Sequence, residues 1–176
     1  MNLDTVDALV GQLAGSEGAS DGEAVDLLAH MLQCAALVTE AAPDDPELQV
    51  AGLVHDLGWQ LTHDPATHAT AGAKAVAPLL GDRVAALVAG HDHAKRYLVT
   101  TDPEYRSRLS ETSVMTLGHQ GGEMSEIERI EFEGGEHFRS LVALRRADDA
   151  AKIPGRVVPG LDAWRATLEA LATSPS

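Results

Sequence analysis

Apolar side chains recur at helical spacing from residue 23 to residue 41. A stripe of period 3.6, which predicts an amphipathic helix, is formed by Leu27, Leu28, Met31, Leu32, Ala35 and Val38. His30 lies within this stripe, where an imidazole without a partner would cost roughly 1–3 kcal/mol. Glu23 falls in the first predicted turn, where an acidic side chain is favoured by the helix dipole.

A second helix is predicted over residues 46–57. Asp45 is its cap, a proline occupies its first position, and Gly58 ends it. His55 and Asp56 are therefore expected in its last turn, next to each other in the chain.

The rest of the chain follows the same helical pattern. We expect a helix that starts near His68, another over 82–98, two short pieces between 103 and 121, a helix opened by the Ser125–Glu128 capping box, an amphipathic helix over 136–152, and a terminal helix over 161–172. The last four residues, 173–176, are expected to fray.

These elements predict a compact all-α fold. One domain over 1–176 is expected, with its core at about 20–152 and the terminal helix packed on it. Few aromatic residues (3%) and scarce β-branched runs also favour helices over sheet.

Composition narrows the class of partner. A net charge of −14 disfavours nucleic acid and anionic membrane, so a small soluble molecule is the expected partner, and no obligatory protein partner is inferred. Cys34 is the one cysteine and sits at an apolar helical position, which indicates a buried small residue. With no disulfide, leader or membrane span expected, the predicted location is the cytoplasm.

Histidine and aspartate carry the candidate chemistry. Five of the eight histidines lie between residues 55 and 93. The residues expected to converge from separate helices are His30, His55, Asp56, His68, His91 and Asp148. Imidazole and carboxylate are ligands that borderline and hard metals prefer, so a helical bundle can hold two ions between them.

The adjacent His55 and Asp56 suit a site with two metals. Neighbours on a helix diverge by about 100°, so this pair cannot chelate one ion as an i, i+4 pair would. The Asp56 carboxylate can instead bridge two ions while His55 holds one. Isolated histidines more often pack or face solvent, and that interpretation applies to His63, His119 and His137.

The order H…HD…H…H…D resembles the HD superfamily of all-helical, metal-dependent enzymes. Within it, the segments HMLQCA, HAKRYL, TLGHQGGEMSEIERIEFE and LRRADDAAK are similar to mixed-valent diiron oxygenases of the phosphonate-cleaving PhnZ type. The resemblance spans roughly residues 20 to 152. It implies an oxygenase of phosphonate catabolism that uses O2 to split the C–P bond of a small 1-hydroxy(amino)phosphonate into phosphate and a carboxylate.

The resemblance also implies the metals. Two iron ions, Fe(II)/Fe(III), form the cofactor, and O2 is the co-substrate. One iron is held by His30, His55, Asp56 and Asp148, and the other by Asp56, His68 and His91. These six residues are the predicted catalytic centre.

Basic residues gather in two stretches of this acidic chain. Lys95 follows His91 by four residues and Arg145 precedes Asp148 by three, so each shares a helix face with a candidate ligand and suits phosphonate oxygens. Lys152 also belongs to the second stretch, and four further basic residues of the two stretches, Arg96, Arg106, Arg108 and Arg146, are expected to be solvated surface charges. By resemblance, the phosphonate is bound by Lys95 and Arg145 with help from Ser113, Thr116 and Gln120, and Glu23 receives a substrate amino group.

Two positions depart from the family pattern. Ser20 stands where the family has a tyrosine that covers the second iron, and serine is too short to reach it. Trp59 stands where the family has a histidine. An indole can stack on a cationic headgroup or fill core space, so Trp59 is a candidate substrate-binding residue and the amine of the substrate stays open.

Two alternatives keep the fold and change the function. A phosphohydrolase acting on a small phosphate ester would use the same six ligands. A non-catalytic HD domain that binds metal or a ligand and regulates a partner is the third interpretation. The intact set of six polar ligands weighs against it, because buried polar groups without metal cost stability.

Overall fold

The structure is a computed structural model that describes residues 3–20 and 22–172. The described residues form helices and no strand, which confirms the all-α prediction. The tail predicted to fray, 173–176, lies outside the described residues. The helices are α1 (Val6–Ala14), α2 (Leu27–Ala41), α3 (Pro46–Val54), α4 (Trp59–Thr62), α5 (His68–Thr101), α6 (Pro103–Arg108), α7 (Glu111–His119), α8 (Glu126–Glu133), α9 (Phe138–Ala150), a 3₁₀ turn η1 (Leu161–Trp164) and α10 (Arg165–Ala172).

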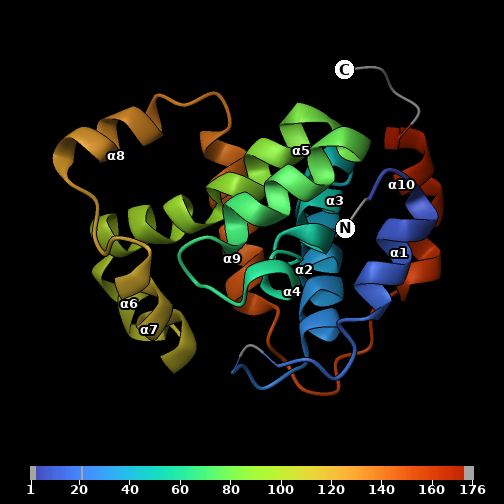
Figure 1. The fold of residues 1–176 in the computed structure, drawn as a ribbon. Helices are drawn as coiled ribbons and strands as arrows, with labels where there is room; N and C mark the ends of the chain where they lie inside the picture. Colours follow the sequence, from blue (N-terminus) through green and yellow to red (C-terminus); the bar gives the residue numbers. More distant parts are fainter. Residues whose placement is uncertain (1–2, 21, 173–176) are drawn as a thin grey trace.

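Four helices make the centre of the molecule. α2 packs against α3 and α9, and α5 packs against the same two helices, so α2, α3, α5 and α9 form a bundle (Figure 1). Its interior is aliphatic, and among its fully buried side chains are Met31, Leu53, Leu87 and Leu144. This bundle is the frame on which the candidate ligands sit.

Most of the remaining helices lie on two flanks of the bundle, and α4 contacts α5 (Figure 1). α10 lies beside α1 and also contacts α3 and α5. α6, α7 and α8 lie together on the opposite flank. The sequence pattern did not predict α1 or the single turn α4.

α2 begins four residues later than predicted. Asp26 is the actual cap, because its side chain accepts a hydrogen bond from the Ala29 amide at 2.8 Å. Residues 22–25 form bends ahead of the helix. The expectation that Glu23 lies in a first helical turn is therefore wrong, and Glu23 belongs to a loop.

α3 ends at Val54, one residue before the predicted His-Asp pair. His55 is the C-cap and its Nδ1 lies 2.9 Å from the Gly52 carbonyl oxygen. The turn then tightens, because the Leu57 and Trp59 amides donate to carbonyls three residues back at 3.1 and 3.0 Å. Asp56 thus projects from a turn after the helix and not from its last turn.

The two helices predicted from His68 to Leu98 are joined end to end in α5. Gly81 interrupts them with φ 83° and ψ 174°, a conformation that glycine adopts without strain. His68 lies on the first segment and His91 on the second. The angle at Gly81 therefore sets how these two histidines approach each other.

Gly58 is needed for a close contact between the turn after α3 and the start of α5. A Cβ atom at this position would lie 1.8 Å from the His68 carbonyl oxygen and 2.9 Å from the Gly72 nitrogen. No side chain fits in that space. Gly58 consequently brings the His55–Asp56 turn and His68 together.

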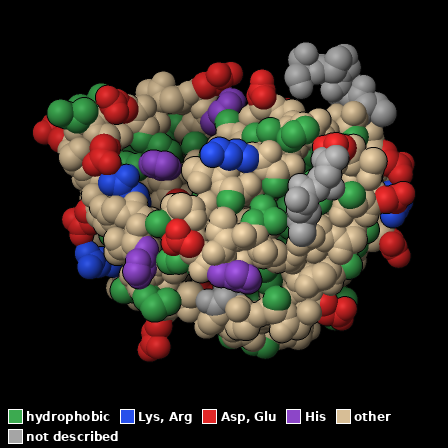
Figure 2. Space-filling model, viewed as in Figure 1, with side chains coloured by type: hydrophobic (Ala, Val, Ile, Leu, Met, Phe, Trp, Pro, Cys, Tyr) green, Lys and Arg blue, Asp and Glu red, His purple; other side chains and the backbone are tan. Residues whose placement is uncertain are grey.

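Acidic side chains outnumber basic ones in this chain. Acidic side chains are scattered around the face shown in Figure 2, with few lysines and arginines between them, in keeping with the net charge of −14. Among the described helices, none has both the length and the apolar content needed to cross a bilayer.

Replacing Gly58 with alanine should destabilise the fold and disturb the site at once. The Cβ atom collides with backbone that cannot move aside alone, so we expect the free energy of unfolding to fall by about 1–3 kcal/mol. Urea denaturation followed by circular dichroism measures this change. Gly118→Ala is the control, because nothing lies within 4 Å of its Cβ position in α7 and alanine favours helix by about 0.5–1 kcal/mol. Equal stability of the two variants would contradict the role given to Gly58.

Candidate metal centre

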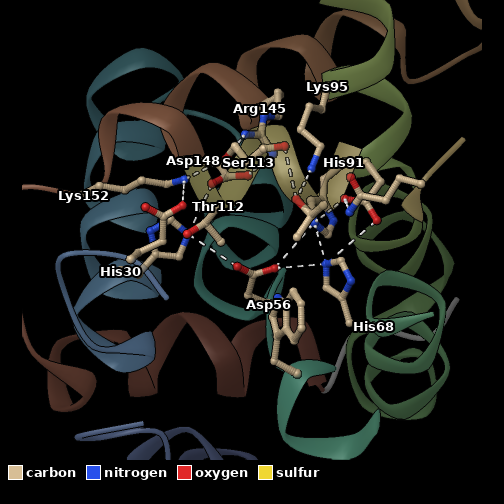
Figure 3. A pocket seen from close by; sticks show the side chains of 15 residues that line it. His30, Asp56, His68, His91, Lys95, Thr112, Ser113, Arg145, Asp148 and Lys152 are labelled. Atoms are coloured by element: carbon tan, nitrogen blue, oxygen red, sulfur yellow. Dashed lines mark hydrogen bonds and ion pairs between the residues drawn. The ribbon is translucent and has the colours of Figure 1, made fainter. Parts of the chain in front are cut away.

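All six predicted ligands converge inside the bundle. Each is at most 6% exposed, although the residues come from α2, the turn after α3, α5 and α9. Figure 3 shows the Asp56 carboxylate between His30 on one side and His68 and His91 on the other. The structure thus places these side chains as the sequence predicts; their role as ligands remains a proposal.

The four imidazoles share one orientation. Their Nδ1 atoms lie 2.7–3.1 Å from backbone carbonyl oxygens, which are those of Ala151, Gly52, Pro65 and Val88 for His30, His55, His68 and His91 respectively. A carbonyl only accepts, so each Nδ1 carries the proton and donates it. Each neutral ring therefore presents the bare lone pair of Nε2 to the centre, the tautomer of a metal-bound histidine.

One group of donors forms around His30 and His55. Their Nε2 atoms are 3.2 Å apart and lie 3.5 and 3.4 Å from Asp56 Oδ2. Asp148 adds its Oδ1 at 3.3 Å from His30 Nε2 and its Oδ2 at 3.9 Å from His55 Nε2. Two imidazoles and two carboxylates thus face one small volume.

A second group forms around His68 and His91. Their Nε2 atoms are 3.3 Å apart, and Asp56 Oδ1 lies 3.4 Å from the first and 3.5 Å from the second. The two oxygens of Asp56 therefore serve different groups. This is the arrangement expected of a bridging carboxylate.

The donor set fits metal cations. Two ligands bound at about 2.1 Å to one ion lie roughly 3.0–3.4 Å apart, depending on the coordination geometry. The donor separations in both groups are close to this range, and lone pairs that face one another across it repel unless a cation lies between them. Each group can hold one ion.

Protons compete for the same positions. Burial disfavours the charged form, but hydrogen bonds to Asp148 and Asp56 raise the pKa of His30 to about 10. For His91, burial is likewise outweighed by Asp92 and Asp56, which raise the pKa to about 9. Burial dominates at His55, where it lowers the pKa to about 4. Metal cations that bind here must displace protons from His30 and His91.

Arg145 is fully engaged beside Asp148. Its Nη1 lies 2.8 Å from Asp148 Oδ2, its Nε donates to Tyr105 Oη at 3.0 Å, and its Nη2 pairs with Asp149. Burial opposes ionisation of Asp148, yet Arg145 holds the pKa of this carboxyl well below its usual range. Tyr105 and Asp149 are thus positioning residues for Arg145 that sequence reasoning missed.

Lys95 differs from Arg145 in its surroundings. It is buried, and its Nζ donates to Thr116 Oγ1 at 2.9 Å. No carboxylate of the described residues is within ion-pairing distance of it, whereas the carboxylates of Asp148 and Asp149 neutralise Arg145. Burial and the nearby Arg145 lower the pKa of Lys95 to about 8. An anion is the natural partner for such a cation.

The other predicted substrate-binding residues lie at the same cavity. Ser113 Oγ accepts from Arg145 at 3.4 Å and from Lys152 at 3.1 Å. The Gln120 amide nitrogen donates to Asp92 at 2.6 Å. The Trp59 indole stacks on the His68 ring, with centroids 4.6 Å apart and planes at 23°. Trp59 therefore covers a candidate ligand as well as lining the cavity.

Glu23 lines the cavity in contact with a cation of the protein itself. Its Oε1 lies 2.6 Å from Lys152 Nζ and accepts from Ser110 Oγ at 2.6 Å. Sequence reasoning gave Lys152 no role in the site. The signal for Lys152 was available, because it lies four residues after Asp148 on the same amphipathic segment.

Asp92 is another residue that the sequence interpretation passed over. It directly follows His91, so the chain contains a second His-Asp pair. Its carboxylate is buried and lines the cavity. Repetition of the dipeptide was the signal that could have drawn attention to it.

One expectation about surface charge is wrong. Arg96 is only 8% exposed, because Gly122 and Glu128 accept hydrogen bonds from its guanidinium at 2.9 and 2.7 Å. It ties α5 to the α7–α8 connection. Arg106, Arg108 and Arg146 are exposed as predicted, and Cys34 is buried as predicted. Of the three histidines given no ligand role, His63 and His119 are exposed and His137 is half-buried.

The cavity above the ligands is small and lined with charge. It contains about 340 Å³ of space between protein atoms, part of it open to solvent. Its lining has four carboxylates, Glu23, Asp56, Asp92 and Asp148, and three cations, Lys95, Arg145 and Lys152.

Comparison with known proteins gives consistent matches. Residues 27–132 match the family described as HD domain. A hydroxymethylphosphonate dioxygenase of Gimesia maris is 35% identical over 157 residues, covering 84% of this chain and 78% of the relative. A 1-hydroxy-2-(trimethylamino)ethylphosphonate dioxygenase (glycine-betaine-forming) of Leisingera caerulea is 34% identical over 152 residues, covering 81% and 76%. The uncharacterized protein L432 of Acanthamoeba polyphaga mimivirus is 31% identical over 175 residues, covering 93% and 78%.

Asp56→Ala should abolish binding at both groups, because each loses the shared carboxylate. We expect metal content to fall from two ions per chain to nearly none after dialysis, measured by inductively coupled plasma mass spectrometry. Asp44→Ala, which removes an exposed aspartate, is the control and should keep both ions. Retention of two ions by Asp56→Ala would disprove the bridge.

Proposed function

We propose that this chain, which belongs to the HD domain family and is a metal-dependent oxygenase, oxidatively cleaves the carbon–phosphorus bond of a small 1-hydroxyphosphonate. The observation that carries the proposal is the position of Lys95, a buried cation that pairs with no carboxylate of the described residues, at the edge of two His/Asp groups. Relatives named as phosphonate dioxygenases support it over most of the chain.

The proposed reaction balances with dioxygen alone. A 1-hydroxyphosphonate, R–CH(OH)–PO₃H₂, and one O2 give the carboxylic acid R–COOH and phosphoric acid. The C–P bond and the C–H bond of the same carbon break, the carbon gains one oxygen and the phosphorus gains the other. Two iron ions in the Fe(II)/Fe(III) state, held by the six ligands, supply the activation of O2 when bound.

The charges of the cavity fit a phosphonate when metals are present. Without metal, the four carboxylates of the lining face Lys95, Arg145, Lys152 and the protonated rings of His30 and His91. Two cations of charge two or more that replace these two protons add at least two positive charges beside the cavity, which strengthens the attraction for a dianion. Anion binding is therefore coupled to metal binding, and the chain should bind phosphonate more weakly without metal.

Lys95 and Arg145 have distinct tasks in this proposal. Lys95, with Thr116 beside it, binds phosphonate oxygens as the available cation. Arg145 is held in position by Tyr105 and Asp149, and its other contacts are Nη1 with Asp148 and Nη2 with Ser113. Its task is to neutralise Asp148 and to place a positive charge beside the cavity. Ser113 and Gln120 supply neutral hydrogen-bonding groups, and the Trp59 ring shields His68 from water.

The Glu23–Lys152 pair favours a substrate without an ammonium group. Glu23 is the carboxylate that the family resemblance assigns to a substrate amine, but here Lys152 already contacts it at 2.6 Å. A substrate ammonium would have to displace or share this contact. We therefore expect hydroxymethylphosphonate, which has no amine, to be a better substrate than an aminophosphonate.

Oxygen-dependent phosphate release tests the reaction. Iron-loaded protein, prepared without air and partly oxidised, should consume one O2 per hydroxymethylphosphonate and release formate and phosphate in equal amounts. An oxygen electrode and a phosphate assay measure these products, and 1-hydroxy-2-aminoethylphosphonate should react more slowly. Phosphate released from a phosphate ester without oxygen would support a hydrolase instead.

Substrate affinity should fall as pH rises through about 8. Burial lowers the pKa of Lys95 to about 8, so its cationic form is present below that pH and lost above it. We expect affinity for hydroxymethylphosphonate to decline about tenfold between pH 7 and 9, measured by anaerobic calorimetry. Lys95→Arg, which stays charged, controls for titration of the phosphonate. An identical decline in Lys95→Arg would remove Lys95 as the cause.

A further inference from the structure

Asp92 occupies a distinctive position beside the second donor group. Its Oδ1 lies 3.4 Å from His91 Nε2 and its Oδ2 lies 3.9 Å from His68 Nε2. The Nδ1 protons of both rings are engaged with backbone carbonyls, so each ring faces Asp92 through its Nε2 atom. A ring nitrogen and a carboxylate oxygen at this separation need a proton or a metal cation between them, and a metal ion that binds here takes the place of the proton.

The same relation exists on the other side of Asp56. Asp148 has one oxygen 3.3 Å from His30 Nε2 and the other 3.9 Å from His55 Nε2. Asp92 repeats these two separations against His91 and His68 within 0.1 Å. Each group thus consists of two imidazoles, one oxygen of Asp56 and one further carboxylate.

Asp148 and Asp92, the carboxylates that each belong to one group only, differ in the residues that neutralise them. Asp148 pairs with the Arg145 guanidinium at 2.8 Å. Asp92 instead accepts a hydrogen bond from the neutral Gln120 amide at 2.6 Å, and among the described residues it forms ion pairs with histidines only. Gln120 fixes the direction of the carboxylate without cancelling its charge. A buried carboxylate in this state is stabilised by a cation.

We infer that Asp92 is a further protein ligand of the second metal, so that both ions have two imidazole and two carboxylate donors. This inference rests on the two-metal centre of the proposed function. Gln120 acts through Asp92 as a positioning residue in addition to lining the cavity. The extra carboxylate fills one coordination position of the second ion and adds a negative charge, which favours a hard cation there.

Metal titration of paired variants tests the assignment without measuring activity. In a His30→Ala background, which weakens the first site, Mn(II) bound to the second site is counted from the electron paramagnetic resonance of unbound ion. Asp92→Asn should weaken this binding at least about tenfold, and Asp92→Glu should restore most of it. Asp148→Asn in the same background should change it less than about threefold, because Asp148 belongs to the other group.

A reciprocal background and an exposed control complete the design. The His68→Ala background weakens the second site and keeps the first one intact. In this background, Asp148→Asn should weaken Mn(II) binding at the first site and Asp92→Asn should not. Asp44→Asn should behave as the parent, and circular dichroism confirms that each variant is folded. Unchanged Mn(II) affinity of the second site in Asp92→Asn would overturn the assignment alone. A wild-type chain that binds fewer than two Mn(II) ions would overturn both the two-metal centre and this inference.

Discussion

Repulsion between buried lone pairs is the constraint on which this structure depends. Four Nε2 atoms and the oxygens of Asp56 and Asp148 face each other at 3.2–3.9 Å in a region almost closed to water. Backbone carbonyls hold the Nδ1 protons on the far side of every ring, so the rings cannot relieve the repulsion by changing tautomer. Protons or metal cations must occupy the centre, and the surrounding helices keep the donors together until they do.

Backbone packing produces this convergence. Without a side chain at Gly58, the turn that carries His55 and Asp56 can approach the first residue of α5. α9 brings Asp148 from the opposite side, and the Tyr105–Asp149 pair prevents Arg145 from turning away from it. The charges of the outer cavity are then arranged around a centre that is already fixed.

Local pattern predicted much of this molecule. Periodicity, caps and the Ser125–Glu128 box located most helices, and the order of histidines and aspartates identified the six converging side chains. Pattern failed where the outcome depends on three-dimensional neighbours. Carbonyls of a distant loop buried Arg96, and Lys152 reached Glu23 across 129 positions. In both contacts the partner is far away in the sequence, so local pattern does not identify it.

The break at Gly81 divides α5 into two rigid arms, each with one imidazole of the second group. His68 on the first arm and His91 on the second bring their Nε2 atoms to 3.3 Å from each other. Gly81, the joint between the arms, is not next to either histidine in the sequence. A small rotation at this joint would change the distance and angle between the two Nε2 atoms without changing either ligand residue. Evolution can therefore adjust the reactivity of the centre from a distance, through the residues that pack on the joint.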